Sequence, residues 1–585
     1  MSYDPILKVF KKDYEKVDRS NWQLNNKNRL SMDFGYLYPV AIYDVLPNTY
    51  FKLDMNAVLS SNPTIAPMLG SAKLRAEAYF IEKAAYAPKL RQNQRLPVER
   101  NVPWPVTNSY RSPQYGLTSN QPIYFSPATG LLEHLNMYPA DWRSSDWNTI
   151  TSGATTSSLD DFPSLNGIPL LMYYDIFRNY YLNVQDDNVP LRTYGFDPSS
   201  STLGQIEDTY ITRENLDSFI EDSISGGKVD EAYYDSFGVS MLPSVYRPTN
   251  TTSWQSDPIN HFAFSHYGLL RRTYNNDFFT SYISNENVTL MKSGTSIDTR
   301  SGSITVEQIS VANRNWRFRM RSLLWGTDWS DYNRVHFGTR VITRYGKPQF
   351  LGSLSSDIIF NDIISQSQSG SNLTNTLDSN TNLGSRAGLA FGNVTNKTRD
   401  PKDYKPFVEF TTEEEGFVMV LLSLVPEVNY FQGVDPMYFK TNLNQSYSPE
   451  YNAIGMQDFF KAWCSVILNR DFAGMTYTRW REWNTAIHKV PMWFEYMARY
   501  NQLHGYFTLD NVYKYWTFTR PFTNLGEYFK SLSSDSYGFY DSTYVLPELH
   551  NYMFANPIGY DNFQCSIKFD CFQKQLLDKQ IIAYL

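Results

Sequence analysis

The sequence has very few of the residues that build a disulfide framework or a metal centre. Of its 585 residues three are cysteines, Cys464, Cys565 and Cys571, and no two form a C-x-x-C pair. An odd count without such a pair argues against a disulfide scaffold or a zinc site and favours folding in a reducing compartment. The closest two of the seven histidines, His261 and His266, are five residues apart, which is not a metal-ligand spacing on a helix. We therefore expect no metal and no cofactor.

Catalytic signatures and long apolar runs are also lacking. No H-E-x-x-H, G-x-S-x-G or complete P-loop pattern occurs. The longest apolar stretch, Phe417 to Val425, falls far below the ~18 residues that a membrane helix needs. Consecutive carboxylates at Glu413, Glu414 and Glu415 point in different directions, so we interpret them as a solvated turn before a strand and not as a glycosidase pair. We do not expect an enzyme.

Aromatic residues, in contrast, are abundant, at 16% of the chain with 44 Tyr and 37 Phe. Such residues favour half-buried pleated surfaces and large contact interfaces. Apolar alternation predicts three successive strands near residues 36–46, 49–59 and 73–83, without helices between them, which indicates an antiparallel sheet. Strand character returns at 407–433, 503–509, 511–519 and 565–572. Helical patterns occur at Leu170–Asn183 and Val306–Trp325.

This division of the strands predicts a mainly β protein, a jelly roll with long loop and helix-containing insertions. We expect a basic N-terminal arm over residues 1–30, and first jelly-roll strands with long loops over 31–186. An acidic insertion follows over 187–266. The remaining strands and helices fill 267–585, with a Ser/Asn/Gly-rich loop at 365–396.

Charge is unevenly divided along the chain. Residues 1–30 carry seven basic and four acidic side chains, so 7 − 4 = +3. Residues 187–265 carry four basic and twelve acidic ones, so 4 − 12 = −8, against −7 for the whole chain. One block therefore accounts for the net negative charge. The arm fits either a sequence-independent contact with a phosphate backbone or an ordinary solvated terminus. Its candidate nucleic-acid-facing residues are Lys8, Lys11, Lys12, Lys16 and Arg19.

Several motifs occur in order along the chain. The first lie in residues 35–90, which include DVLPNTYFKL from Asp44, IAPML from Ile65 and AYFIEK from Ala78. Later ones are RRTYNNDFFTSYI (from Arg271), RVHFG (Arg334), KPQFLG (Lys347), EEGFVMVLLSLVPEVNYFQGVDPMYFK (Glu414) and DNFQCSIKFDCFQKQLLDKQI (Asp561). In sequence and in order, over nearly the whole chain, these motifs resemble the major capsid proteins of the Microviridae, most closely the gokushovirus-like group.

The resemblance implies a single eight-stranded antiparallel jelly roll of the viral capsid type. It implies that about sixty copies close into a T=1 icosahedral shell around a circular single-stranded DNA phage genome. The expected partners are other copies of the chain, the packaged DNA, a small basic DNA-packing protein, a pilot protein and a host surface receptor. The expected location is the virion, assembled in the cytoplasm of a bacterial host.

In this resemblance the acidic insertion lies where gokushovirus-like members carry an outward projection. Its candidate host-facing residues are Asp217, Glu221, Asp222, Asp230 and Glu231. Two other functions fit the composition. Aromatic richness with paired carboxylates is compatible with a carbohydrate-binding or glycan-cleaving β-sandwich. The aromatic, weakly basic segment Trp493–Phe507 could stack single-stranded bases, although packing inside the fold is the simpler interpretation.

Overall fold

The protein is mainly β, with antiparallel sheets and few helices, in a computed structural model. The structure describes residues 19–66, 68–87, 106–107, 131–137, 165–183, 188–196, 203–226, 269–284, 306–325, 329–339, 346–363, 387–395, 406–452, 455–464, 486–507, 513–520, 522, 543–554 and 561–577.

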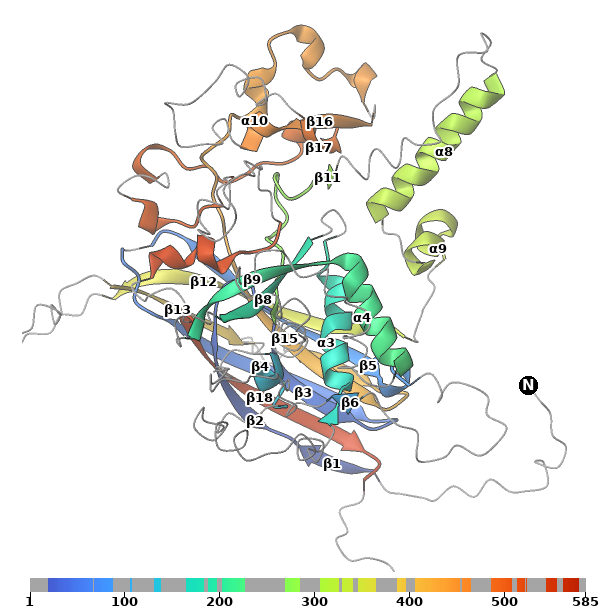
Figure 1. The fold of residues 1–585 in the computed structure, drawn as a ribbon, viewed down its shortest axis with the longest axis vertical. Helices are drawn as coiled ribbons and strands as arrows, with labels where there is room; N and C mark the ends of the chain where they lie inside the picture. The colour runs from blue at the N-terminus through green and yellow to red at the C-terminus, as the bar shows by residue number, and fades with distance from the viewer. Residues whose placement is uncertain are drawn as a thin grey trace, which may run out of the picture.

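A ten-stranded sheet forms the body (Figure 1). Its order is β1-β18-β4-β13-β12-β5-β15-β3, with β2 also paired to β18 and β14 to β4. The strands are β1 (Ser20–Gln23), β2 (Asn26–Met32), β3 (Tyr38–Val45), β4 (Tyr50–Ser61), β5 (Ser71–Glu82), β12 (Gln349–Ile363), β13 (Ala387–Thr395), β14 (Val408–Thr411), β15 (Gly416–Pro426) and β18 (Phe563–Gln575).

The sheet curls until its two ends approach each other. β2 and β3 belong to opposite ends of the strand order. In a flat sheet they would be separated by tens of ångströms, at about 4.8 Å per strand. Instead the Asn28 side-chain amide donates to the Val40 carbonyl at 2.8 Å, and the Tyr43 hydroxyl donates to Asn26 at 2.9 Å. The apolar face is therefore enclosed within the curl.

Side-chain alternation explains which face is enclosed. Along β18, Phe563, Cys565, Ile567, Phe569 and Cys571 are buried, while the residues between them are half-buried or exposed. β5 alternates likewise in its first half. β15 differs, because all of its residues are buried. Both faces of β15 are therefore covered, and this explains why its sequence is continuously apolar and does not alternate.

Two elements lie over this part of the sheet. The segment after Leu270 contacts β15 through Arg272, which donates to the Ser423 hydroxyl, and a helix packs on the neighbouring β5, where the Tyr180 and Tyr79 ring centroids are 4.8 Å apart. α3 (Ile168–Tyr180) is buried along most of its length, and the side chain of Asn166, two residues before it, accepts from the Ile168 amide at 3.0 Å. α4 (Arg213–Gly226) packs on α3, and its Leu216, Phe219 and Ile220 join the core (Figure 1).

Smaller sheets and helices surround this body. One three-stranded sheet contains β8 (Asn188–Phe196), β9 (Leu203–Thr212) and β10 (Leu269–Leu270). Another contains β11 (Ile283–Ser284), β16 (Met456–Phe460) and β17 (Ala486–Pro491). β6 (Val106–Thr107) pairs with β7 (Leu165–Asn166). The other helices are α1 (Leu131–His134), α8 (Val306–Trp325), α9 (Trp329–Phe337) and α10 (Lys461–Cys464).

The predicted strands and helices differ from the structure in a few places. The first three strands, both helices and the strand near 565–572 are confirmed, as is the turn before Gly416. Residues 20–30, which we expected in the arm, belong to β1 and β2 and pair with β18. The strands predicted at 503–509 and 511–519 are wrong. Their described parts form the 3-10 turns Gly505–Phe507 and Lys514–Trp516, and Gly505 has a left-handed φ of 70°.

Candidate functional site

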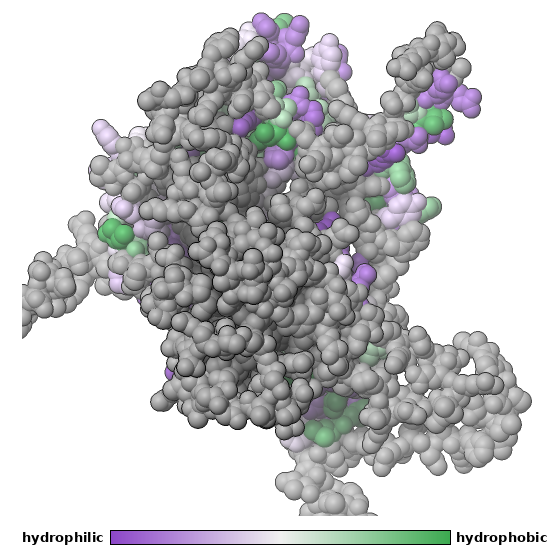
Figure 2. All heavy atoms as spheres, in the orientation of Figure 1, coloured by the Kyte–Doolittle hydropathy of each residue, from purple (hydrophilic) through white to green (hydrophobic). Residues whose placement is uncertain are grey.

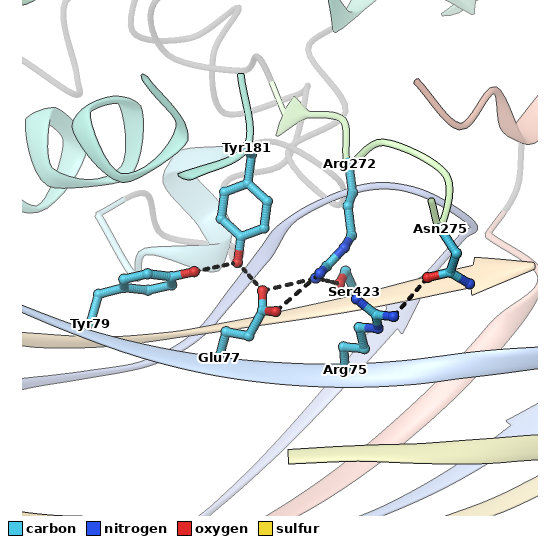
Figure 3. Close-up of polar contacts among 7 residues, drawn as sticks. All are labelled: Arg75, Glu77, Tyr79, Tyr181, Arg272, Asn275 and Ser423. Carbon is cyan, nitrogen blue, oxygen red and sulfur yellow. Dashed lines mark hydrogen bonds and ion pairs between the residues drawn. The ribbon is translucent and has the colours of Figure 1, made fainter. Parts of the chain in front are cut away.

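A buried ion pair joins the sheet to the segments that cover it (Figure 3). Arg272 follows β10 and binds Glu77 of β5 in a bidentate manner, with N–O distances of 2.8 and 3.0 Å. Arg272 also donates to the hydroxyl of Ser423 on β15 at 3.0 Å. The Tyr181 hydroxyl donates to Glu77, and the Tyr79 hydroxyl donates to that of Tyr181 at 2.9 Å.

The chemistry of this cluster suits a structural clamp. Burial opposes the charge of Arg272, but the attraction of Glu77 outweighs it and raises the pKa of the guanidinium. Burial, with the nearby Tyr79 and Glu77, raises the pKa of Tyr181 well above its usual value. Both carboxylate oxygens of Glu77 already accept hydrogen bonds from fixed donors. The cluster therefore holds α3 and the segment after β10 against the sheet.

The segment 543–554 contains a second buried polar group, His550. His550 is fully buried and its Nε2 lies 2.8 Å from the Tyr274 hydroxyl. Burial lowers the pKa of His550 to about 3, so the ring is neutral at physiological pH. Nearby, the buried Arg271 lies over the ring of Tyr36 at 5.0 Å and donates to the Val545 carbonyl at 3.4 Å. These contacts hold the segment 543–554 against Arg271 and Tyr274, and Arg271 in turn lies against Tyr36.

The described surface also carries two sets of exposed large apolar side chains. The first, here called the platform, lies between residues 437 and 497 in the segments before β16 and after β17. Leu443 is 88% exposed and Tyr438 70% exposed. Its members are Met437, Tyr438, Leu443, Tyr447, Tyr451, Tyr496 and Met497.

Buried contacts hold the platform in place. Trp493, which has a left-handed φ of 68°, donates from its indole nitrogen to the Tyr451 carbonyl at 3.0 Å. The ring centroids of Trp493 and Tyr447 are 5.6 Å apart. The Lys440 ammonium lies 4.0 Å from the Tyr496 ring centroid and pairs with Glu495. Burial opposes the charge of Glu495, but hydrogen bonds from Lys440 and Gln457 lower its pKa. The platform is thus a rigid aromatic surface.

The second set lies on a helical hairpin formed by α8 and α9, which stands away from the body in Figure 1. Phe318 of α8 stacks on His336 of α9 with ring centroids 4.5 Å apart. Val306 is 80% exposed, and Ile309, Val311 and Phe337 are also exposed. Figure 2 shows hydrophobic and hydrophilic side chains next to each other on this hairpin.

The structure describes only some of the site residues that the sequence predicts. Arg19 is exposed just before β1, and Lys8, Lys11, Lys12 and Lys16 lie outside the described residues. Asp217 of α4 forms an ion pair with Arg178 of α3 at 3.5 Å, and Glu221 is exposed. Asp222 lies in α4, and Asp230 and Glu231 lie outside the described residues. Of the described ones, Asp217 and Glu221 share α4, and Arg19 precedes β1.

Sequence reasoning missed the platform, because it interpreted Trp493–Phe507 as packing inside the fold and made no structural prediction for residues 437–451. In the segment 493–507, Trp493 and Phe494 are buried as the packing interpretation expects, but Tyr496 and Met497 are exposed. One signal could have revealed the first part of the platform. Pro, Asn and Gln are frequent between residues 436 and 452, and this composition favours irregular surface structure.

Comparisons with known proteins do not identify the chain. No protein-family model matches the sequence, and no curated protein matches it. Among the described residues, no cluster of three or more His, Cys, Asp or Glu could hold a metal ion. No described helix is long and apolar enough to cross a membrane.

Proposed function

We propose that the chain is the major capsid protein of a microvirus-like, gokushovirus-like phage, and that it assembles into a closed T=1 shell of about sixty copies around single-stranded DNA. The observation that carries the proposal is the pair of exposed apolar surfaces on one folded chain, the platform and the hairpin. Single exposed apolar residues are ordinary, but grouped ones indicate contact with another molecule. Rich Tyr and Met content is typical of protein interfaces.

The sheet supports the finer architecture. We infer that the curled sheet is an enlarged jelly roll, with β3, β15, β5 and β12 in one half and β13, β4 and β18 in the other. Long segments between β5 and β12, and between β15 and β18, provide the insertions that such a shell subunit uses for contacts. The acidic insertion would face the host, with Glu221 exposed on its α4 helix, and the arm would face the DNA.

Electron microscopy and sedimentation of the purified full-length chain test the proposal. Sixty copies of a 67.9 kDa chain give about 4 MDa, a mass that a monomer or small oligomer cannot approach. Uniform closed particles of that mass support the shell. A chain that stays monomeric over a wide range of concentration and salt contradicts it.

The exposed rings of the platform also favour a second candidate, glycan binding, since aromatic faces stack on sugars. A glycan array with the full chain separates the two candidates. Binding that Tyr496→Ala and Tyr438→Ala abolish, by a chain that never assembles, would favour a glycan-binding β protein. Assembly without glycan binding would favour the capsid proposal.

A further inference from the structure

In the part of the chain that the structure describes, the helix α8 packs mainly against one short helix. It has 20 residues, which is about 30 Å of helix. Isolated helices are marginal in water, and most helical stability in proteins comes from packing of an apolar face. Its described contact is with the nine-residue α9, through Phe318. Among the described elements this short helix covers one side of α8, and Val306 and Ile309 on another side are exposed.

Helical periodicity shows what the open side presents. Val306, Ile309 and Trp316 recur at positions that share one face, which is turned away from the face of Phe318 that meets α9. Val306 and Ile309 are exposed. Arg314, Arg317 and Arg321 are also exposed and form an adjoining stripe at spacings of three and four residues. α8 carries four Arg and one Glu, so 4 − 1 = +3.

The chain itself holds a surface that is complementary to this helix. The platform presents tyrosine rings, methionines and Leu443, with the exposed carboxylate of Glu450 beside Tyr451, while Asp435 is already paired with Arg499. It already binds one cation over a ring, at Lys440 and Tyr496. Elsewhere the fold places arginine over tyrosine rings at about 5 Å in three pairs, Arg271–Tyr36, Arg272–Tyr181 and Arg520–Tyr274. Arginine, tyrosine and methionine are the residues enriched at interfaces.

We propose that the α8–α9 hairpin of one copy docks on the platform of a second copy of this chain. Val306 and Ile309 bury against Leu443 and the neighbouring rings, while the arginine stripe lies over tyrosine faces. Such a contact joins two different surfaces, so it is heterologous, and repetition of a heterologous contact closes into rings or shells. The inference rests on the proposed function and identifies one of its interfaces. The β-branched apolar face favours a protein partner over nucleic acid, which offers it nothing to bury against.

Two single variants of the full-length chain test this contact. Ile309→Asp damages the hairpin and Leu443→Asp damages the platform. Both side chains are exposed, so circular dichroism of each purified variant should match the parent chain. Each variant alone should self-associate at least tenfold more weakly, because every contact of this kind then includes a damaged surface. The matched control Leu24→Asp alters an exposed leucine between β1 and β2 and should leave this contact intact.

Mixing the two variants decides the matter. The intact hairpin of Leu443→Asp meets the intact platform of Ile309→Asp, so the mixture should sediment as a 1:1 dimer. The chain with both substitutions should not pair with itself. A mixture that stays monomeric, or variants that associate like the parent, overturns the inference. Loss of nucleic acid retention alone in Arg317→Glu, with association unchanged, would overturn it in favour of a nucleic-acid surface.

The same material separates this inference from the proposed function. Closed particles formed equally well by the parent and both variants would uphold the shell and refute the contact. A 1:1 dimer from the mixture, with open oligomers and no closed particles from the parent chain, would uphold the contact and refute the shell.

Discussion

At the scale of residues, the Glu77–Arg272 pair is the contact with the largest predicted effect. Glu77→Gln keeps the shape of the side chain but leaves the guanidinium buried without its counter-charge. We expect the unfolding free energy of the unassembled chain to fall by about 3–5 kcal/mol, measured by urea denaturation. The exposed pair Lys73–Asp357, at 4.0 Å, provides the control. Asp357→Asn should cost less than about 1 kcal/mol. Equal losses for the two variants would contradict the clamp.

His550 predicts a stability that depends on pH. Burial lowers its pKa in the folded chain to about 3, whereas the unfolded value is 6.5. The unfolded chain therefore binds more protons between these values. Stability is complete above pH 6.5 and falls as the pH is lowered toward 3, by an amount on the order of 4 kcal/mol.

Unfolding free energies measured between pH 4 and 7.5 test this effect of His550. His550→Gln removes the titrating group but keeps a side chain that can reach the Tyr274 hydroxyl. The variant should show a flatter pH profile than the parent chain. If both chains lose stability equally on acidification, other groups cause the loss.

At the scale of elements, β18 places two thiols inside the curl of the sheet. Burial raises the pKa of Cys565 and of Cys571 to about 12, and Cys464 is buried as well. Since the thiolate is the reactive form, we expect none of the three to react with a maleimide at pH 8 in the folded chain. All three should react in urea. Rapid labelling of β18 under native conditions would show that this strand opens easily.

The predicted elements succeeded where a periodic pattern agreed with its surroundings. β5 and β18 alternate because one face is enclosed, and α8 repeats with helical spacing, so a local pattern was sufficient. The strand predictions for 503–509 and 511–519 were wrong because they depended on aromatic content. Aromatic residues indicate a partly buried surface, but they do not show that a strand forms it. Tyr506 and Tyr513 are exposed and contact each other at 6.4 Å instead.

At the scale of the whole molecule, the ten-stranded sheet is complete only when its last strand, β18, has paired. β18 lies between β4 and the pair β1 and β2, and its Cys571 amide donates to Asn25, 546 positions earlier. We expect a chain ending at residue 560 to lack a cooperative unfolding transition and to be digested rapidly by protease. A chain ending at Leu577 keeps every described strand and should fold. A protease-resistant sheet in the shorter chain would contradict this requirement.

The sequence by itself determined the mainly β character, the first three strands, the two helices and the uneven charge, because these depend on local composition and spacing. Only the tertiary structure decided that residues 20–30 belong to the sheet and that Glu77 and Arg272 meet between the sheet and the segments that cover it. It also decided which tyrosines are exposed. The physical reason is that strand pairing and burial depend on partners hundreds of residues away, and a period along the chain does not say which partner covers a side chain. A surface such as the platform is therefore visible only in the folded molecule.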